Sequence, residues 1–325
     1  MGARVPASQG MMPSAAELEH LLGPALSPRL ATDGIALLRR TWVGQGSFPK
    51  EILTLSVDGR KVELFCKYEG GFDHSSHGHR GGVGYEARVY EEILAPSGSS
   101  TPKMILAHRP ADRADTWLFL EYLSEAIRVS KATEPCAMAQ VAEWIGRFHA
   151  RATASDVPAF VRRYDHDYYR GWVERTDARV REGGGVGEWW PRALRCFAGQ
   201  LDVLGECEPS LLHGEYYPKN VLWAPDRVSP VDWESAAVGA GPIDLVSLVD
   251  GWPDPLRRRC TDAYVRGRWQ LGAPSWFWDQ CSLAEVYLHL RWLGDDAWGR
   301  QGTQPAREWP RVRRIGELAK SLGWV

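Results

Sequence analysis

The stretch that most constrains the fold spans residues 211–234 and reads LLHGEYYPKNVLWAPDRVSPVDWE. Two apolar runs flank a short turn at residues 224–227, and this pattern predicts a β-hairpin. The acidic and amide side chains of the stretch lie outside the hairpin, at Glu215, Asn220, Asp232 and Glu234. Because the strands of a hairpin fold back on each other, we expect polar groups from both open ends to share one small region.

Carboxylate and amide oxygens gathered in this way suit a divalent cation. Mg²⁺ prefers hard oxygen ligands and keeps several waters, so one carboxylate and one amide from the protein suffice. Glu215 precedes Asn220 by five residues, the offset between base and metal-binding Asn in a kinase catalytic loop. The hairpin then returns Asp232 to the neighbourhood of Asn220. Phosphoryl transfer needs a cation on the phosphates and a group that orients the acceptor hydroxyl, so the stretch predicts this chemistry.

The rest of the chain divides into a strand-rich part and a helical part. Up to residue 124 the apolar runs alternate partly, as half-buried antiparallel strands do, and one helix is predicted over residues 85–95. Beyond that point the apolar spacing is helical almost throughout, apart from the hairpin. We therefore expect an α+β protein whose domains span residues 1–124 and 125–325. The crevice between two such lobes is the default place for a ligand.

Composition narrows the classes of function. The 325 residues carry a formal net charge of -2, so no strong global field attracts nucleic acid or a membrane surface. No run of about 18 apolar residues occurs, which argues against a membrane span. None of the six cysteines forms a C-x-x-C pair. We expect free thiols in a reducing cytoplasm rather than a disulfide framework.

A segment rich in glycine, serine and histidine, GGFDHSSHGHRGGVG, begins at residue 70. Its histidines, His74, His77 and His79, raise the possibility of a metal site. The glycine and serine content favours a mobile polar loop instead, and this is our expectation.

The spaced set HGEYYPKNVL, VDWE and GPIDL resembles the signature of aminoglycoside phosphotransferases and their choline-kinase-like relatives. The resemblance implies a two-lobed, protein-kinase-like fold that uses Mg²⁺ and ATP, with GTP as an alternative donor. It implies that Asn220 and Asp232 are the magnesium ligands and that Glu215 stands where the family has its catalytic Asp. It also implies that His213 supports the same loop and that Asp244 braces the loop backbone.

In the first lobe the resemblance implies a nucleotide site. Lys67, in ELFCKYE, matches the strand lysine that contacts ATP phosphates, and Glu86 matches the helix carboxylate that pairs with it. A solvated edge-strand lysine and an acidic residue in a first helical turn are the alternatives. Backbone groups of the hinge and of a phosphate-covering turn complete the site, at Glu121, Leu123, Gly44, Gly46 and Ser47.

Glu215 departs from the family pattern because its carboxylate sits one methylene farther from the backbone than that of Asp. A misplacement of about 1 Å can lower a rate roughly 10²-fold. Either the acceptor pocket fits the longer side chain, or the protein is a nucleotide-binding pseudoenzyme that acts as an interaction module. We favour a small-molecule kinase because Lys67, Asn220 and Asp232 are all present. No D-F-G triplet or A-P-E segment occurs, which argues against a protein kinase.

We expect the acceptor to be a hydroxylated small molecule: an aminoglycoside-like antibiotic, a sugar or another natural product. Acidic and imidazole side chains of the helical part would suit a cationic amino sugar, or they form solvated helix faces: Asp165, Asp167, Glu285, His289, Asp295 and Asp296. Aromatic side chains would suit a flatter substrate, or they pack the core: Tyr216, Tyr217, Trp233 and Trp292. Antibiotic resistance and biosynthetic tailoring both fit this activity, in a monomer or a homodimer.

Overall fold

The computed structural model describes residues 12–26, 35–44, 47–70, 76–110, 115–155, 157–205, 207–296 and 304–325. Its contacts divide the chain into two compact units. The first unit comprises the chain up to Ser75 together with Gly81–Ala126. The second comprises Ser76–Arg80 together with Ile127–Val325. The short segment Ser76–Arg80 thus belongs to the second unit although it interrupts the first in the sequence.

The first unit is built on a five-stranded sheet with the strand order β1-β2-β3-β5-β4, in which every neighbouring pair is antiparallel. Its elements are α1 (Ala15–Leu26), β1 (Ile35–Trp42), β2 (Lys50–Val57), β3 (Arg60–Tyr68), α2 (Gly82–Val89), the π-helical turn η3 (Tyr90–Leu94), α3 (Ala95–Ser97), β4 (Met104–His108) and β5 (Trp117–Glu121). The run α2–η3–α3 forms one continuous helical segment. The predicted helix inside a strand-rich part is therefore confirmed.

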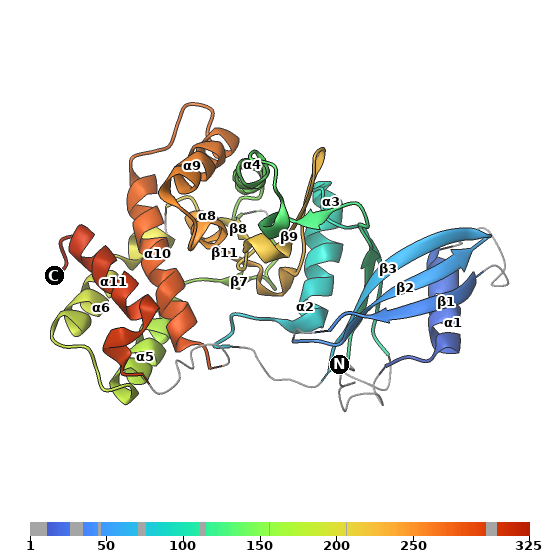
Figure 1. Ribbon diagram of the computed structural model, residues 1–325, viewed down its shortest axis with the longest axis horizontal. Helices are drawn as coiled ribbons and strands as arrows, with labels where there is room; N and C mark the ends of the chain where they lie inside the picture. Colours follow the sequence, from blue (N-terminus) through green and yellow to red (C-terminus); the bar gives the residue numbers. More distant parts are fainter. Residues whose placement is uncertain are drawn as a thin grey trace. The chain divides into compact units, whose positions relative to one another are not determined.

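Local sequence explains the β2–β3 turn of this sheet and the start of the helix that packs on it. Asp58 and Gly59 both have positive φ angles, 50° and 77°, which is the backbone that a tight two-residue hairpin needs between β2 and β3. In Figure 1, α1 lies against the sheet, and Leu18 and Leu22 are fully buried in the core shared with β2 and β3. Glu17 N–H donates to Ser14 Oγ while Ser14 N–H donates to the Glu17 carboxylate, so a capping box starts this helix.

The second unit is mainly helical, with two small three-stranded sheets, β10-β9-β6 and β7-β11-β8. Its elements are β6 (Ile127–Arg128), η4 (Val129–Lys131), α4 (Ala137–Arg151), β7 (Arg162–Arg163), α5 (His166–Glu182), α6 (Trp189–Ala198), α7 (Leu201–Gly205), β8 (Ser210–Leu212), η5 (Pro218–Asn220), β9 (Val221–Ala224), β10 (Arg227–Pro230), η6 (Trp233–Ser235), β11 (Ala237–Gly239), α8 (Pro242–Val249), α9 (Asp254–Arg268), α10 (Trp276–Gly294), η7 (Ala306–Glu308) and α11 (Pro310–Ser321). The α+β class and the hairpin predicted from the sequence are confirmed.

Helix α10 is the centre of the second unit. It packs against α5, α8 and α11, and these helices surround it in Figure 1. Charged side chains interrupt its apolar sequence, and Glu285, His289 and Arg291 are all buried. Because buried charged groups need partners, this helix has to receive ion pairs from its neighbours. No helix among the described residues is long and apolar enough to cross a membrane.

Candidate active site

The loop that follows β8 is fixed by one buried carboxylate. Asp244 of α8 is fully buried, and its two oxygens accept the backbone N–H groups of His213 (2.7 Å) and Gly214 (2.9 Å). His149 of α4 lies with Nε2 3.2 Å from the same carboxylate, and burial lowers the pKa of that imidazole. The neutral ring therefore donates to Asp244. These bonds brace the loop backbone, the role that the resemblance gives to this residue.

Gly214 is required by the close approach of two backbone segments. Its φ angle is +81°, and a Cβ atom here would collide with the backbone carbonyl of Ser235. His213 holds the same region from the other side: its Nε2–H donates to Val231 O at 2.9 Å, and its ring lies against Trp233. The His-Gly pair therefore shapes the loop, and it does so without a free imidazole nitrogen, because Nδ1 accepts the N–H of Glu215.

The hairpin brings the two predicted metal ligands to one end. Asn220 Nδ2 donates to the backbone carbonyl of Glu215 at 3.0 Å, which turns the amide oxygen to the opposite side. Val231 N–H donates to Asn220 O at 2.9 Å, so Asp232 follows directly beside Asn220. Asp232 adopts a left-handed backbone with φ 72°, an uncommon conformation for a residue other than glycine. Backbone geometry of this kind concentrates at functional sites.

The donor set fits a magnesium ion. One amide oxygen and one carboxylate are hard oxygen ligands, and Mg²⁺ completes its octahedral shell with water and substrate phosphates. Within the described ranges no group of three or more His, Cys, Asp or Glu side chains could hold a metal ion. A cation bound by Asn220 and Asp232 needs no such group.

Three side chains that are distant in the sequence lie against the Glu215 carboxylate. Its Oε1 lies 3.0 Å from Arg80 Nη2, 3.4 Å from His79 Nε2 and 3.5 Å from Arg291 Nη1. All four side chains are buried. Arg80 also contacts the buried carboxylate of Asp295 at 3.3 Å. The carboxylate at the position of the catalytic Asp is therefore the centre of a buried ion-pair network.

This network fixes the protonation states. Burial opposes ionisation of Glu215, but the contact with His79 and the charges of Arg80 and Arg291 outweigh it and hold the pKa well below its usual range. Burial and the nearby Arg291 lower the pKa of His79 to about 3. The imidazole is therefore neutral at pH 7. Its Nε2 lies 3.4 Å from the Glu215 carboxylate, and its Nδ1 accepts from a tyrosine.

Tyrosines from three parts of the second unit complete the network around His79. Its Nδ1 lies 2.9 Å from the hydroxyl of Tyr168 and 3.0 Å from that of Tyr164. Tyr168 continues to Tyr287 of α10 at 2.8 Å, and the Tyr164 and Tyr168 rings stack at 4.1 Å. Because the Tyr164 and Tyr287 rings are buried and the Tyr168 ring is half-buried, the orientation of His79, and through it that of Glu215, is set by packing.

The expectation of a mobile polar loop is wrong for Ser76–Arg80. His79 is fully buried, Arg80 is 6% exposed, and the His77 ring packs against Tyr168 and Trp172. The residue His74 lies outside the described residues. A composition rich in Gly and Ser predicts solvent exposure only where no partner covers the segment, and here α5 and α10 provide partners. The one sequence signal for these contacts was Arg291, a charged residue inside an apolar helical run.

Acidic residues proposed for the acceptor separate into two groups. Glu285, His289 and Asp295 are buried, so the interpretation as solvated helix faces is wrong for them. Asp167 and Asp296 are exposed, and Asp165 caps α5 by accepting the N–H of Tyr168. Among the aromatic candidates, three are buried in the core: Tyr216, Tyr217 and Trp233. Trp292 is partly buried against the core of the second unit.

In the first unit the structure brings Lys67 and Glu86 together. Lys67 Nζ lies 2.7 Å from Glu86 Oε2, and both side chains are buried. The lysine projects from β3 and the carboxylate from α2, so the pair joins the sheet to the helix. The ammonium also lies 5.1 Å from the centre of the Phe48 ring. A buried lysine fixed in this way offers a positive charge of defined position, not a solvated edge-strand side chain.

The remaining residues assigned to the nucleotide lie at the edges of this sheet. Glu121 ends β5, where its N–H donates to Lys103 O at 2.8 Å. Leu123 follows two residues later, and its carbonyl accepts the N–H of Ala126. Ser47 is half-buried just before β2, and Gly46 lies outside the described residues. The contacts of these groups with a nucleotide stay predictions.

Comparison with known proteins decides the family. The sequence pattern of the phosphotransferase enzyme family matches residues 74–277, well over half of the chain. The chain belongs to this family. The match includes the loop after β8, the hairpin β9–β10 and α8, which carry the residues described above. The recognition made from the spaced motifs is confirmed.

Solved structures of phosphotransferases share the fold of this family member. Choline kinase from Cryptosporidium parvum Iowa II has a TM-score of 0.61 at 14% identity, covering 94% of this chain and 97% of its own. The macrolide 2′-phosphotransferase apoenzyme from Brachybacterium faecium has a TM-score of 0.59 at 18% identity, covering 91% and 99%. Aminoglycoside 2′-phosphotransferase-IIIa in complex with GDP has a TM-score of 0.57 at 13% identity, covering 93% and 96%. Comparison with curated proteins gives no match. The predicted kinase-like fold is thus confirmed.

Proposed function

We propose that this protein transfers the terminal phosphate of ATP, or alternatively GTP, to a hydroxyl group of a small molecule, with Mg²⁺ as cofactor. One observation carries the proposal. Asp244 fixes the loop that presents Glu215 and Asn220, and the hairpin returns Asp232 beside Asn220. Membership of the phosphotransferase enzyme family supports the reaction class.

In the second unit one set of residues would bind the metal ion and another would orient the acceptor. Asn220 and Asp232 would hold the cation, which when bound neutralises charge on the phosphates. Glu215 would accept a hydrogen bond from the acceptor hydroxyl and so aim its oxygen at phosphorus. Because the pKa of Glu215 is held well below its usual range, the side chain is ionised at pH 7 and contributes mainly by orientation.

In the first unit the residues bind the nucleotide. Lys67, fixed by Glu86, would donate to phosphate oxygens and stabilise the charge that shifts toward the leaving diphosphate. Backbone groups near Glu121 and Leu123 would hold the base, and Ser47 with the turn before β2 would cover the phosphates. The charge-assisted contact of Lys67 is the strongest of these interactions.

The acceptor oxygen forms a bond to the terminal phosphorus, and the bond from that phosphorus to the oxygen of the departing nucleoside diphosphate breaks. The hydroxyl proton, oriented by its hydrogen bond to Glu215, leaves to solvent. The products are the phosphorylated acceptor and the nucleoside diphosphate.

A second candidate is a nucleotide-binding pseudoenzyme that serves as an interaction module. It is favoured by the contacts of Glu215, whose Oε1 already meets His79, Arg80 and Arg291. A carboxylate so engaged has less capacity to take a proton. This candidate predicts ATP binding without phosphorylation of any acceptor.

The test compares wild type with Asp232→Asn and, as a matched control, Asp226→Asn at the exposed turn of the same hairpin. Each protein is assayed for nucleoside diphosphate release over a panel of hydroxylated small molecules. We expect Asp232→Asn to lower turnover by about 10²-fold, as loss of one preorganised charge-stabilising group does, and Asp226→Asn to leave it unchanged. Equal turnover in all three proteins would refute the metal role, and ATP binding with no turnover would establish the second candidate.

We place the reaction in the cytoplasm. All six cysteines lie among the described residues and are free thiols, and Cys66 and Cys260 are buried. Burial raises the pKa of the Cys260 thiol to about 11, so this group is unreactive at pH 7. Free thiols of this kind are typical of a reducing compartment.

A further inference from the structure

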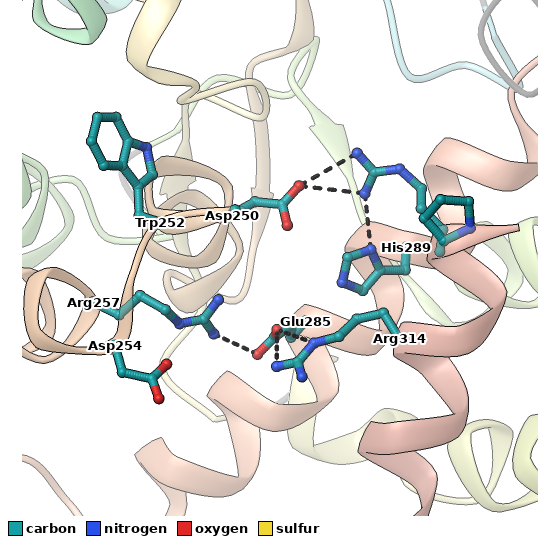
Figure 2. Close-up of a pocket in the computed structure, with 10 residues that line it drawn as sticks. Asp250, Trp252, Asp254, Arg257, Glu285, His289 and Arg314 are labelled. Atoms are coloured by element: carbon teal, nitrogen blue, oxygen red, sulfur yellow. Dashed lines mark hydrogen bonds and ion pairs between the residues drawn. The ribbon is translucent and has the colours of Figure 1, made fainter.

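A separate cavity lies in the second unit, where the end of α8 and the start of α9 meet α10 and α11. Its volume is about 490 Å³, within the range of small-molecule sites. The lining includes Asp250, Asp254, Arg257, Glu285, His289 and Arg311. Figure 2 shows Asp250, which follows α8, Arg257 of α9, and Glu285 and His289 of α10 around the same space. None of them takes part in the phosphate chemistry proposed above.

Opposite charges line this cavity in pairs. Glu285 lies between Arg257 and Arg314 in Figure 2, with its oxygens 2.9 Å and 2.8 Å from the two guanidinium groups. Arg311 lies 3.4 Å from Asp250. With Asp254 at the start of α9, the lining contains three guanidinium groups and three carboxylates. The arginines would repel a polycationic ligand, and the carboxylates would repel a polyanionic one.

His289 supplies a donor that needs a ligand. It is 4% exposed, and its Nδ1 lies 2.8 Å from Arg311 Nη1, which can only donate. Nδ1 is therefore the acceptor and Nε2 carries the hydrogen, since burial and Arg311 lower the pKa of the imidazole to about 3. Nε2 has no hydrogen-bond partner among the described residues. A buried donor without a partner is costly, so the cavity favours a ligand with an acceptor atom there.

The indole ring of Trp292 lies between one cavity residue, Arg311, and one partner of Glu215, Arg291. Arg311 lies 4.9 Å from the centre of the Trp292 ring, and Arg291, the partner of Glu215, lies 5.3 Å from the same ring. The Tyr217 ring is 5.6 Å from Trp292 as well. Helix α10 thus carries both the cavity residues and the arginine that contacts the carboxylate of the catalytic loop.

We propose that this cavity binds the acceptor, and that the acceptor is an uncharged, hydroxyl-rich ring compound of the sugar or glycoside class. This inference rests on the proposed function. A hydroxyl group both accepts and donates, so it satisfies His289 Nε2–H and a carboxylate such as Asp250 at once. The half-buried Trp252 at the cavity offers an aromatic face to the apolar side of a sugar ring.

The first experiment measures binding without nucleotide, by ligand-observed NMR, to skeletons that differ only in charge. The probes are glucose, glucosamine and glucuronate, with trehalose, sucrose and a set of uncharged aryl glucosides as larger neutral members. We expect binding by neutral members and at least tenfold weaker binding by the amine and the acid. Binding by the charged members alone, or no binding by any neutral member, would overturn the proposal.

The second experiment uses His289→Phe and His289→Gln, with the exposed His20→Phe as matched control. Phenylalanine removes the donor and should weaken binding of the neutral probe about threefold to tenfold, the change that one neutral hydrogen bond represents. Glutamine can accept from Arg311 and donate into the cavity, so it should preserve affinity. Equal affinities of wild type and a folded His289→Phe would overturn the role of Nε2. The probe series in wild type decides the ligand class even where His289→Phe does not fold.

The two proposals fail in distinguishable ways. If the cavity binds neutral glycosides but Asp232→Asn and wild type phosphorylate them equally, the proposed mechanism is wrong and the ligand class stands. If phosphorylation depends on Asp232 but the substrates are polycations that bind unchanged in His289→Phe, the cavity proposal is wrong and the kinase stands.

Discussion

Glu215→Gln tests whether the buried ion-pair network holds the second unit together. The substitution keeps the shape of the side chain but removes its charge, and it leaves Arg291 without the carboxylate that it contacts at 3.5 Å. Removing one partner of a buried ion pair costs about 3–5 kcal/mol, because the other charge stays buried. In this variant Arg80 keeps its ion pair with Asp295, and the charge of the nearby Glu234 also favours the ionised form of Arg80. We therefore expect the lower end, about 3 kcal/mol.

For a unit of about 200 residues, each kcal/mol corresponds to roughly 2–4 °C in Tm, so the expected decrease is about 6–12 °C. Differential scanning calorimetry measures it, and Glu174→Gln, an exposed position on α5, is the matched control. The pH dependence gives a second readout. Because the folded pKa of Glu215 is depressed, its contribution is complete above the unfolded value of about 4.3 and is lost as pH falls through the folded pKa.

The difference in stability between wild type and Glu215→Gln should therefore be constant near neutral pH and should narrow in acid. A Tm equal to that of wild type at pH 7 would show that the arginines do not depend on this carboxylate. A difference that persists unchanged in strong acid would show that the effect of the substitution is steric and not electrostatic.

Two further predictions concern the two halves of the proposed machinery. Lys67→Met removes a charge-assisted hydrogen bond worth about 1.5–3 kcal/mol, so nucleotide should bind roughly 10–150-fold more weakly by calorimetric titration. The control Lys61→Met, on the exposed part of the same strand, should bind nucleotide as wild type does. An unchanged nucleotide affinity of Lys67→Met would contradict the phosphate role of Lys67. Gly214→Ala should destabilise the fold by at least about 2 kcal/mol in urea unfolding, because a left-handed backbone and a backbone collision combine. Gly272 has φ +93° but no atom near the position of a Cβ, so Gly272→Ala measures the cost of the left-handed backbone alone. Equal losses of unfolding free energy in the two variants would contradict a collision at Gly214.

Much of the fold could be predicted from local patterns. The dipeptide Asp58-Gly59 predicts the hairpin β2–β3, and apolar residues at four-residue steps predict the helical segment that begins with α2. Both signals depend on nearby residues alone. The hairpin β9–β10 was predictable for the same reason, and so was the return of Asp232 to the side of Asn220. The family followed from spacing, since a loop, a hairpin and a braced helix impose fixed separations along the chain.

The environment of Glu215 could not be predicted in this way. Its partners His79, Arg80 and Arg291 are 136, 135 and 76 residues away, and their own neighbours in the sequence indicate a loop and a core helix. Capping shows the same limit on a smaller scale: a glycine commonly marks the end of a helix, but α1 passes through Gly23 and extends to Leu26.

The sequence by itself determined the elements, the spacing of the catalytic loop and the chemical type of its groups, because each depends on contacts within a few residues or across one turn. Only the tertiary structure decided which charges meet. Burial removes water from Glu215 and from the cavity around His289, and there ionisation, orientation and ligand preference depend on groups supplied by distant helices.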